Sequence, residues 1–237
     1  SLINQNYQPQ EIIIIDNEGS FKTKNLISSI LKNKISYIYK PITKTNNVAI
    51  LRNIAAKKAK SSYLAFLDDD DFWHKKYLFY SKKIINIKKT DLLISNISKF
   101  ENKNSYHFSN FKKGKKFKIN DFLLVNPGTL CSNIIVRKKT FLELYGFDKN
   151  ISGSCDKDLV LRFLKQKKKI NINHNYHVFY RFHNNQWSIN SRKVIFQKIL
   201  FYKKYFNLYS FIYHLKFMKV ILNIAFNSIF KKKHNTL

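Results

Sequence analysis

Short apolar runs alternate with longer amphipathic segments along most of the chain. Residues 11–16 (EIIIID) and 63–67 (YLAFL) are rich in β-branched or aromatic side chains, and both end in polar clusters. This pattern is typical of buried strands that end in loops. Similar runs predict further strands at residues 36–39, 91–97 and 129–136, with strand-like pieces within 169–181. Residues 99–118 are polar and basic without a clear period, which predicts a loop or a weak hairpin.

Helical periodicity fills the segments between these strands. It is clearest at residues 49–59 (AILRNIAAKKA), and it predicts further helices at 25–31, 75–86, 138–145 and from Asp156 or Asp158 onwards. Gly146 is a natural left-handed stop for the helix that precedes it. Strands that alternate with helices in this way predict an α/β fold, with a mostly parallel sheet flanked by helices.

The last part of the chain has a different character. From about residue 193 to 233 it is basic and aromatic, and its spacing predicts two amphipathic helices. We therefore divide the chain into a main domain at residues 1–190 and a helical tail at residues 191–237. The tail either lies on an anionic membrane surface or packs its apolar face on the main domain, and its length and basic end favour the membrane.

Composition narrows the class of protein. The 237 residues are 44% hydrophobic and 16% aromatic, which is enough to bury a sizeable core and excludes a disordered chain. A surplus of 44 Lys and Arg over 14 Asp and Glu gives a formal net charge of +30. Such a surface attracts polyanions, either nucleic acid, anionic lipid or phosphorylated substrates, although codon bias toward Lys and Asn explains the charge equally well.

Targeting signals and cysteines bear on location. The opening SLINQNYQPQ is polar, so we expect no signal peptide, and its first residue is Ser, so the natural N-terminus is expected to lie upstream. Cys131 and Cys155 lack the spacing of a zinc site and fit a reducing compartment. No apolar run approaches the ~18 residues of a membrane span. We therefore expect a cytoplasmic protein, peripheral on the cytoplasmic face of the inner membrane.

Four of the acidic residues stand together as Asp68, Asp69, Asp70 and Asp71, directly after a predicted buried strand. Open α/β sheets bind ligands at the carboxyl ends of their strands. Side chains of an extended segment alternate, so Asp68 and Asp70 are expected to point the same way. Paired carboxylates suit Mg²⁺ or Mn²⁺ with a diphosphate. The alternative is a solvated acidic turn that caps the following helix.

Three other carboxylates stand at comparable places. Asp16 ends the predicted strand at residues 11–16, where it could accept hydrogen bonds from a base N–H or a ribose hydroxyl, or simply cap a turn. Asp156 and Asp158 precede an apolar-periodic helix. Either one could be the N-cap of that helix, or a general base that deprotonates an acceptor hydroxyl.

These pieces, in this order, resemble the family 2 glycosyltransferases, which have the GT-A fold. The resemblance spans roughly residues 1–190. Its most specific stretch is LRNIAAKKAKSSYLAFLDDDDFW, and its other parts are SLINQNYQPQEIIIIDNEGS, GTLCSNIIVRKKTFLELYGFDKNISGSCDKDLVLRF and YRFHNNQWS.

The resemblance implies a role for each candidate residue. On the donor side, it places Asp16 against the nucleotide base, Arg52 near the nucleotide phosphates, and Asp68 and Asp69 on the nucleotide sugar. It assigns Asp70 and His183 to a Mn²⁺ or Mg²⁺ ion, and Asp71 and Trp73 to the acceptor side. The catalytic base is Asp156, with Asp158 as its alternative. It further implies a UDP- or GDP-sugar donor, inversion at the sugar, and a surface glycan or lipid-linked oligosaccharide as acceptor.

The chain also departs from the family pattern. The resemblance leads us to expect that the first strand of the family is missing, so the strand at residues 12–15 is expected to expose an apolar edge that favours aggregation. Asn17 replaces a second Asp after Asp16, and Cys155 replaces a Glu before Asp156. Three rival functions are a basic nucleic-acid-binding protein, a metal-dependent nuclease and an inactive membrane-surface protein. Simple nucleic-acid binding explains the four aspartates poorly, because they would repel phosphates unless a metal bridges them.

Overall fold

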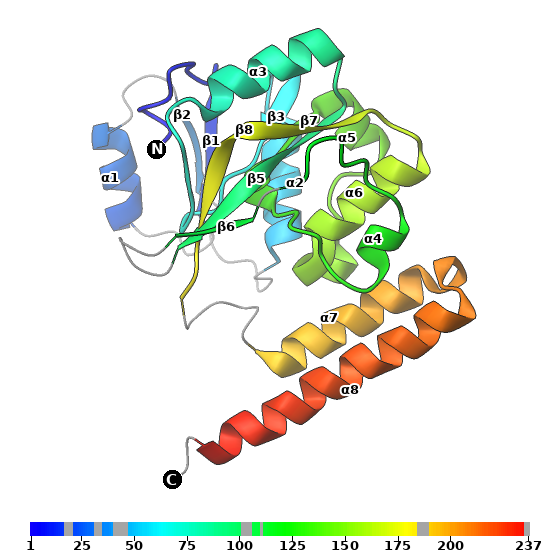
Figure 1. Ribbon diagram of the computed structural model, residues 1–237. Helices are drawn as coiled ribbons and strands as arrows, with labels where there is room; N and C mark the ends of the chain where they lie inside the picture. Colours follow the sequence, from blue (N-terminus) through cyan, green and yellow to red (C-terminus); the bar gives the residue numbers. More distant parts are fainter. Residues whose placement is uncertain are drawn as a thin grey trace.

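The computed structural model describes residues 1–16, 21–30, 35–39, 47–100, 106–109, 111–183 and 190–234. Its centre is a six-stranded sheet, with helix α3 on one face and helices α2, α5 and α6 on the other (Figure 1). A pair of long helices, α7 and α8, lies at one end of the molecule (Figure 1). The sheet and its helices form the α/β architecture that the sequence predicts.

The strands form two sheets. They are β1 (Ile12–Asp16), β2 (Ile35–Tyr39), β3 (Tyr63–Ala65), β4 (Phe72–Trp73), β5 (Leu92–Phe100), β6 (Tyr106–Ser109), β7 (Ile134–Arg137) and β8 (Ile170–Arg181). Strands β1 and β2 pair in parallel, and the larger sheet has the order β3-β7-β5-β8-β4, with β6 paired to β5. Strands β5 and β8 are parallel, but β7 runs antiparallel to both of its neighbours. The larger sheet is therefore mixed, and the expectation of a mostly parallel sheet is wrong in this detail.

Eight α-helices are described. They are α1 (Phe21–Ile30), α2 (Val48–Lys58), α3 (Tyr77–Lys88), α4 (Asn120–Leu123), α5 (Lys138–Glu143), α6 (Cys155–Lys165), α7 (Ser191–Lys204) and α8 (Phe211–His234). Short 3₁₀ turns precede β7 (η1, Cys131–Asn133) and α6 (η2, Lys149–Ser154) and follow α7 (η4, Phe206–Leu208). The side chain of Asn47 caps α2 by accepting from the N–H groups of Ala49 and Ile50. The two predicted tail helices are confirmed as α7 and α8.

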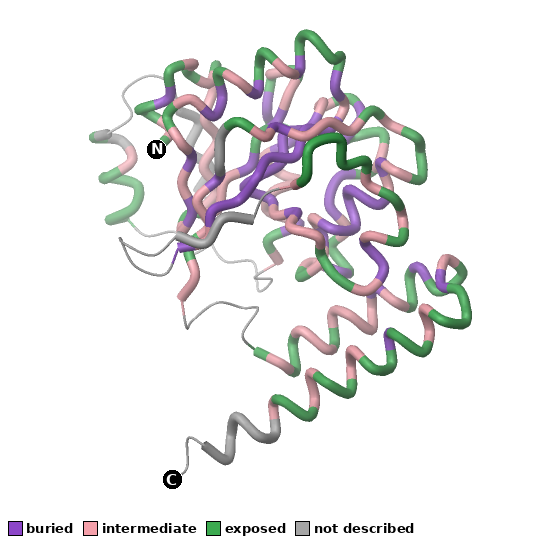
Figure 2. The backbone as a smooth tube through the Cα atoms, viewed as in Figure 1, coloured by how far each residue is buried: buried purple, intermediate pink, exposed green. Residues whose placement is uncertain are grey.

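The central strand β5 is buried on both faces, as strands covered by helices on both sides must be (Figure 2). Leu92 and Ile94 point into the core beneath α2, α5 and α6, whereas Leu93 points toward the α3 side with Trp73 and Tyr77. This double burial fixes the sheet at the centre of the molecule. The loops at its edges are thereby held at defined positions.

Most sequence-predicted elements are present, and several differ in extent. The predicted loop or weak hairpin at residues 99–118 contains β6, which pairs antiparallel with the end of β5. The predicted strand at residues 129–136 is shorter, because η1 occupies residues 131–133 and β7 begins at Ile134. The predicted helix at residues 138–145 ends at Glu143, since Tyr145 and Gly146 both take left-handed backbone angles. The predicted strand at residues 63–67 ends at Ala65. Among the described helices, none has both the length and the apolar character needed to span a bilayer.

Candidate active site

The four consecutive aspartates form a turn between β3 and β4. The N–H of Asp71 donates to the carbonyl oxygen of Asp68 over 3.2 Å, which closes the turn. The expectation that Asp68 and Asp70 share one side of an extended segment is therefore wrong. Each carboxylate instead has its own surroundings, and Asp69 is exposed at the tip.

Asp68 faces the N-terminal half of helix α2. Its Oδ1 accepts from Arg52 Nη2 over 2.5 Å, and the same guanidinium donates to the Cys155 thiol through Nη1 over 3.7 Å. Arg52 also lies 5.8 Å from the centre of the Phe147 ring. A hydrogen bond to Cys155 and burial raise the pKa of the Cys131 thiol, which lies beside this group. Arg52 thus joins the aspartate turn to the start of α6, where Asp156 stands.

Asp70 faces the segment that follows β8. Its Oδ2 lies 3.2 Å from Nε2 of His183, and its backbone carbonyl accepts from Arg181 Nε over 3.0 Å. Both side chains of the Asp70–His183 pair are about one-third exposed, so a ligand can reach them. The structure thus brings together the two residues that the family resemblance assigns to a metal ion, 113 positions apart in sequence.

Asp71 and Trp73 lie beneath the turn rather than on its surface. Asp71 is 8% exposed and Trp73 is 5% exposed. The indole N–H of Trp73 donates to the backbone oxygen of Ser132 over 2.8 Å, and Asp71 accepts from the Arg181 N–H over 3.0 Å. Burial raises the pKa of Asp71 to about 7, despite hydrogen bonds to Ser132 and Arg181 that favour the ionised form. Their burial leaves little room for direct contact with an acceptor, in contrast to the expectation from sequence.

Asp156 lies in the first turn of α6, close to the cluster of Arg52 and Asp68. Its Oδ1 accepts from the Lys157 N–H over 2.7 Å, and its Oδ2 lies 3.4 Å from Nδ2 of Asn126. Burial raises the pKa of Asp156 to about 6, although the Lys157 N–H and the charge of Arg52 oppose the shift. A carboxylate with this pKa can accept a proton near neutral pH, as a general base must.

Asp158 has a different environment, which makes it a poor candidate for the base. It is fully buried, and its two oxygens accept from Arg162, Lys204 and Tyr205. Residues two apart on a helix point in nearly opposite directions, so Asp158 faces α7 while Asp156 faces the cluster. The expectation that Asp158 could replace Asp156 as the catalytic base is therefore corrected: it is a structural anchor between α6 and α7.

Asp16 ends β1, opposite Tyr39 in the neighbouring parallel strand. It is half-buried, and residues 17–20, including Asn17, lie outside the described residues. The structure therefore confirms the strand-end position of Asp16 and leaves its role against a nucleotide base as a prediction. The same holds for Asp69, whose carboxylate is exposed beside those of Asp68 and Asp70.

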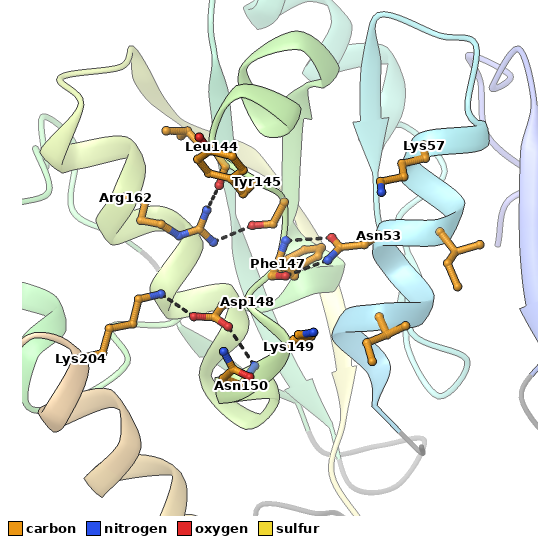
Figure 3. A pocket seen from close by; sticks show the side chains of 13 residues that line it. Asn53, Lys57, Leu144, Tyr145, Phe147, Asp148, Lys149, Asn150, Arg162 and Lys204 are labelled. Atoms are coloured by element: carbon orange, nitrogen blue, oxygen red, sulfur yellow. Dashed lines mark hydrogen bonds and ion pairs between the residues drawn. The ribbon is translucent and has the colours of Figure 1, made fainter. Parts of the chain in front are cut away.

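A cavity of about 590 Å³ lies between α2, the loop after α5 and η2 (Figure 3). Arg162 donates to the carbonyl oxygens of Leu144 and Gly146, and Asn53 both donates to and accepts from the backbone of Phe147 (Figure 3). None of the four aspartates and neither Asp16 nor Asp156 lines this cavity. The candidate carboxylates named from the sequence lie outside this cavity, so we place the candidate active site at the aspartate turn.

Comparison with known proteins decides the family. Residues 1–145, more than half of the chain, match the family described as glycosyl transferase family 2. The chain belongs to this family.

Relatives within glycosyl transferase family 2 match a short part of the chain. It is 40% identical over 73 residues to the UDP-Glc:alpha-D-GlcNAc-diphosphoundecaprenol beta-1,3-glucosyltransferase WfaP of Escherichia coli, covering 31% of this chain and 28% of WfaP. It is 31% identical over 77 residues to the putative teichuronic acid biosynthesis glycosyltransferase TuaG of Bacillus subtilis, covering 32% of this chain and 30% of TuaG. The matched segments span less than a third of these curated relatives.

Solved structures share the fold of this family 2 chain at low sequence identity. S. aureus TarS 1–349, crystallised with UDP-GlcNAc, superposes with a TM-score of 0.65 at 16% identity, covering 84% of this chain and 60% of that chain. A second structure of TarS 1–349 covers 95% of this chain and 66% of that chain, with a TM-score of 0.63 and 15% identity. These values establish the GT-A fold.

Two residues that hold the site together were missed by sequence reasoning. The Ser132 hydroxyl accepts from the Asp68 N–H over 3.1 Å, and its backbone oxygen accepts from Trp73. Asn126 organises its own loop by accepting from the N–H groups of Gly128 and Thr129, and it also reaches Asp156. The Asn-Pro-Gly-Thr sequence at 126–129 is a turn signal that could have indicated an ordered loop, but not its contact with Asp156.

Proposed function

We propose that this family 2 glycosyltransferase transfers a sugar from a nucleoside diphosphate sugar to a hydroxyl acceptor in one displacement, with inversion at the anomeric carbon. The observation that carries the proposal is the Arg52–Asp68 pair, whose guanidinium also contacts Cys155, next to Asp156. This arrangement places the Arg52 guanidinium and the Asp68 carboxylate beside the Asp156 carboxylate, which would accept the proton. Arg52 would attract the diphosphate, and Asp68 would accept from sugar hydroxyls.

In this reaction the acceptor hydroxyl oxygen forms a bond to the anomeric carbon, while the bond from that carbon to the diphosphate oxygen breaks. Asp156 takes the proton of the acceptor hydroxyl, and the nucleoside diphosphate leaves with the bonding electrons. Asn126, 3.4 Å from the Asp156 carboxylate, would orient the base. A single carboxylate base at this position fits a single displacement, which inverts the sugar centre.

A divalent cation fits the Asp70–His183 pair. Carboxylate oxygens suit Mg²⁺ and Mn²⁺, and histidine is a common metal ligand. No group of three or more His, Cys, Asp or Glu donors gathers within the part of the chain that the structure describes, so the oxygens of the diphosphate would complete the ligand set. When bound, the ion would take up negative charge on the leaving diphosphate.

The names of the relatives support a more specific donor and acceptor. WfaP is named for transfer from UDP-Glc to a diphosphoundecaprenol-linked sugar, TuaG for teichuronic acid biosynthesis, and TarS was crystallised with UDP-GlcNAc. We therefore favour a UDP-sugar donor over a GDP-sugar donor. A lipid-linked saccharide or cell-surface polymer at the cytoplasmic face of the inner membrane would be the acceptor.

The test of the donor site is thermal stabilisation of the intact chain by UDP and by GDP, with and without Mn²⁺. We expect UDP with Mn²⁺ to raise the melting temperature, and Asp70→Asn to remove the Mn²⁺-dependent part. Glu143→Gln, which removes an exposed carboxylate from α5, is the matched control and should behave like the unaltered protein. Stabilisation by DNA without any response to nucleotides would favour the nucleic-acid-binding alternative.

The test of the base is transfer activity. Asp156→Asn should retain UDP binding and lose transfer by about 10²–10⁴-fold, the usual contribution of a general base. If Asp156→Asn transfers sugar at the normal rate, Asp156 is not the base.

A further inference from the structure

Helix α7 joins the helical tail to the main domain. Phe201 is buried in the main core, where the Lys157 ammonium lies 3.5 Å from its ring centre. The Tyr205 hydroxyl donates to Asp158 over 2.6 Å, and Lys204 pairs with both Asp158 and Asp148. The tail is therefore packed on the domain through α7, which is one of the two alternatives that the sequence left open.

The inner face of helix α8 is attached to α7 by aromatic contacts. The Phe217 ring stacks on Tyr202 with centroids 4.1 Å apart and planes 5° from parallel. The Tyr202 hydroxyl lies 2.7 Å from His214 Nδ1, and Phe217 is buried. These contacts fix the rotation of α8 about its axis, so its remaining face has a defined direction.

Much of helix α8 is exposed (Figure 2), and its exposed side chains include several large apolar ones. We call the face that carries them the outer stripe, and its six exposed side chains are Phe211 (77% exposed), Ile212 (61%), Leu215 (57%), Met218 (55%), Leu222 (64%) and Phe226 (61%). At about 100° per residue these positions fall within an arc of roughly 120°. Six large apolar side chains aligned on one helix face form a contiguous patch, and a patch of this kind marks an interaction surface.

The charge around the outer stripe indicates what covers it. Lys216 is exposed at the edge of the stripe, Lys219 is exposed within its arc, and residues 231–233 at the end of α8 are also lysines. No Asp or Glu follows Asp158 in the whole sequence. Two copies packed stripe to stripe would bring these lysine-rich helices together without acidic partners from the same segments. An anionic lipid bilayer has an apolar interior and negatively charged headgroups at its surface. It therefore matches both the apolar side chains of the stripe and the lysines around it.

We propose that the outer stripe of α8 lies in the interface of an anionic lipid bilayer, with the helix axis along the membrane surface. The six apolar side chains insert among the upper acyl chains, and Lys216 and Lys219 reach the anionic headgroups. The main domain, attached through α7, remains on the water side. This proposal stands apart from the transferase chemistry, because it concerns a face that contains none of the site residues.

The experiment is co-sedimentation of the intact chain with vesicles of 70% phosphatidylcholine and 30% phosphatidylglycerol (roughly one anionic lipid in three). The double variant Leu215→Gln/Leu222→Gln should bind at least tenfold less, because both side chains leave water on insertion. Its melting temperature should stay close to that of the unaltered protein, since both side chains are exposed. The matched control is Phe79→Gln/Ile87→Gln on α3, at the opposite end of the molecule in Figure 1, which should change binding less than about twofold.

The lysines supply a second readout. Lys216→Gln and Lys219→Gln should each weaken binding by about fivefold at low salt, and 1 M salt should reproduce that loss because it shortens the screening length to about 3 Å. Normal binding by the α8 double variant would overturn the proposal, as would failure of the unaltered chain to sediment with these vesicles. Sedimentation velocity tests the alternative that a second copy of the chain covers the stripe. If the unaltered chain is a dimer that the α8 double variant dissociates, and the unaltered chain does not bind vesicles, the stripe is a dimer interface and the membrane contact is refuted.

Discussion

Replacing Asp71 with Asn should stabilise the protein, and by more at higher pH. Asp71 is 8% exposed beneath the aspartate turn, and burial raises its pKa from 3.8 to about 7. The neighbouring charges of Asp70 and Asp68 act in the same direction. Asparagine keeps an oxygen that can accept from the Arg181 N–H, and it removes the buried negative charge.

The sign and the size follow from linkage. Between about pH 4 and pH 7 the folded protein holds a proton on Asp71 and the unfolded chain does not, so the free energy of unfolding falls as pH rises through this window. A shift of roughly three pKa units at about 1.36 kcal/mol each gives an upper bound of about 4 kcal/mol above pH 7. We expect Asp71→Asn to gain about 2–4 kcal/mol over the unaltered protein at pH 8.5, and close to nothing at pH 4.5.

Urea denaturation at several pH values between 4.5 and 8.5 measures this gain directly. Carboxylates elsewhere titrate in both proteins, so the difference between the two free energies isolates position 71. Asp69→Asn is the matched control, because it removes a charge from the exposed tip of the same turn and should give no comparable pH-dependent gain. If the difference for Asp71→Asn is the same at pH 4.5 and pH 8.5, burial of the Asp71 charge does not destabilise the folded state.

Three further predictions concern positions around the site. Asp158→Asn should lower the free energy of unfolding by about 3–5 kcal/mol, because it leaves the charges of Arg162 and Lys204 without their buried partner. Calorimetry measures this loss, and a transfer assay should show that the specific activity of the folded fraction changes little. Gly146→Ala should cost at least about 1–2 kcal/mol, since φ is +67° and the new Cβ would stand 2.4 Å from the Asn53 oxygen; equal urea midpoints would contradict this. The kcat/KM of transfer should fall about tenfold per pH unit below pH 6, because protonated Asp156 cannot accept a proton, and a flat profile from pH 5 to 7 would exclude it as the base.

Local sequence pattern determined most of the elements and the family. Short β-branched or apolar runs predict buried strands, and apolar residues with a period of 3.6 predict amphipathic helices, so β1, β5, α2 and the tail helices were predictable. The direction of β7 was not, because periodicity is the same for a strand that runs either way. The register and order of the sheet depend on contacts between segments far apart in the chain.

The candidate site was likewise predictable from the sequence in part, and decided by the fold in part. The sequence by itself determined that four aspartates follow a strand, and its resemblance to a family nominated Arg52, Asp156 and His183. Only the tertiary structure decided that the aspartates form a turn, that Asp156 faces this turn, and that Asp158 is held by α7. The physical reason is that each carboxylate takes its partners from elements far along the chain: Tyr205 stands 47 positions from Asp158, and His183 stands 113 from Asp70. A side chain's chemistry is local, whereas the burial and charge that set its role come from the whole fold.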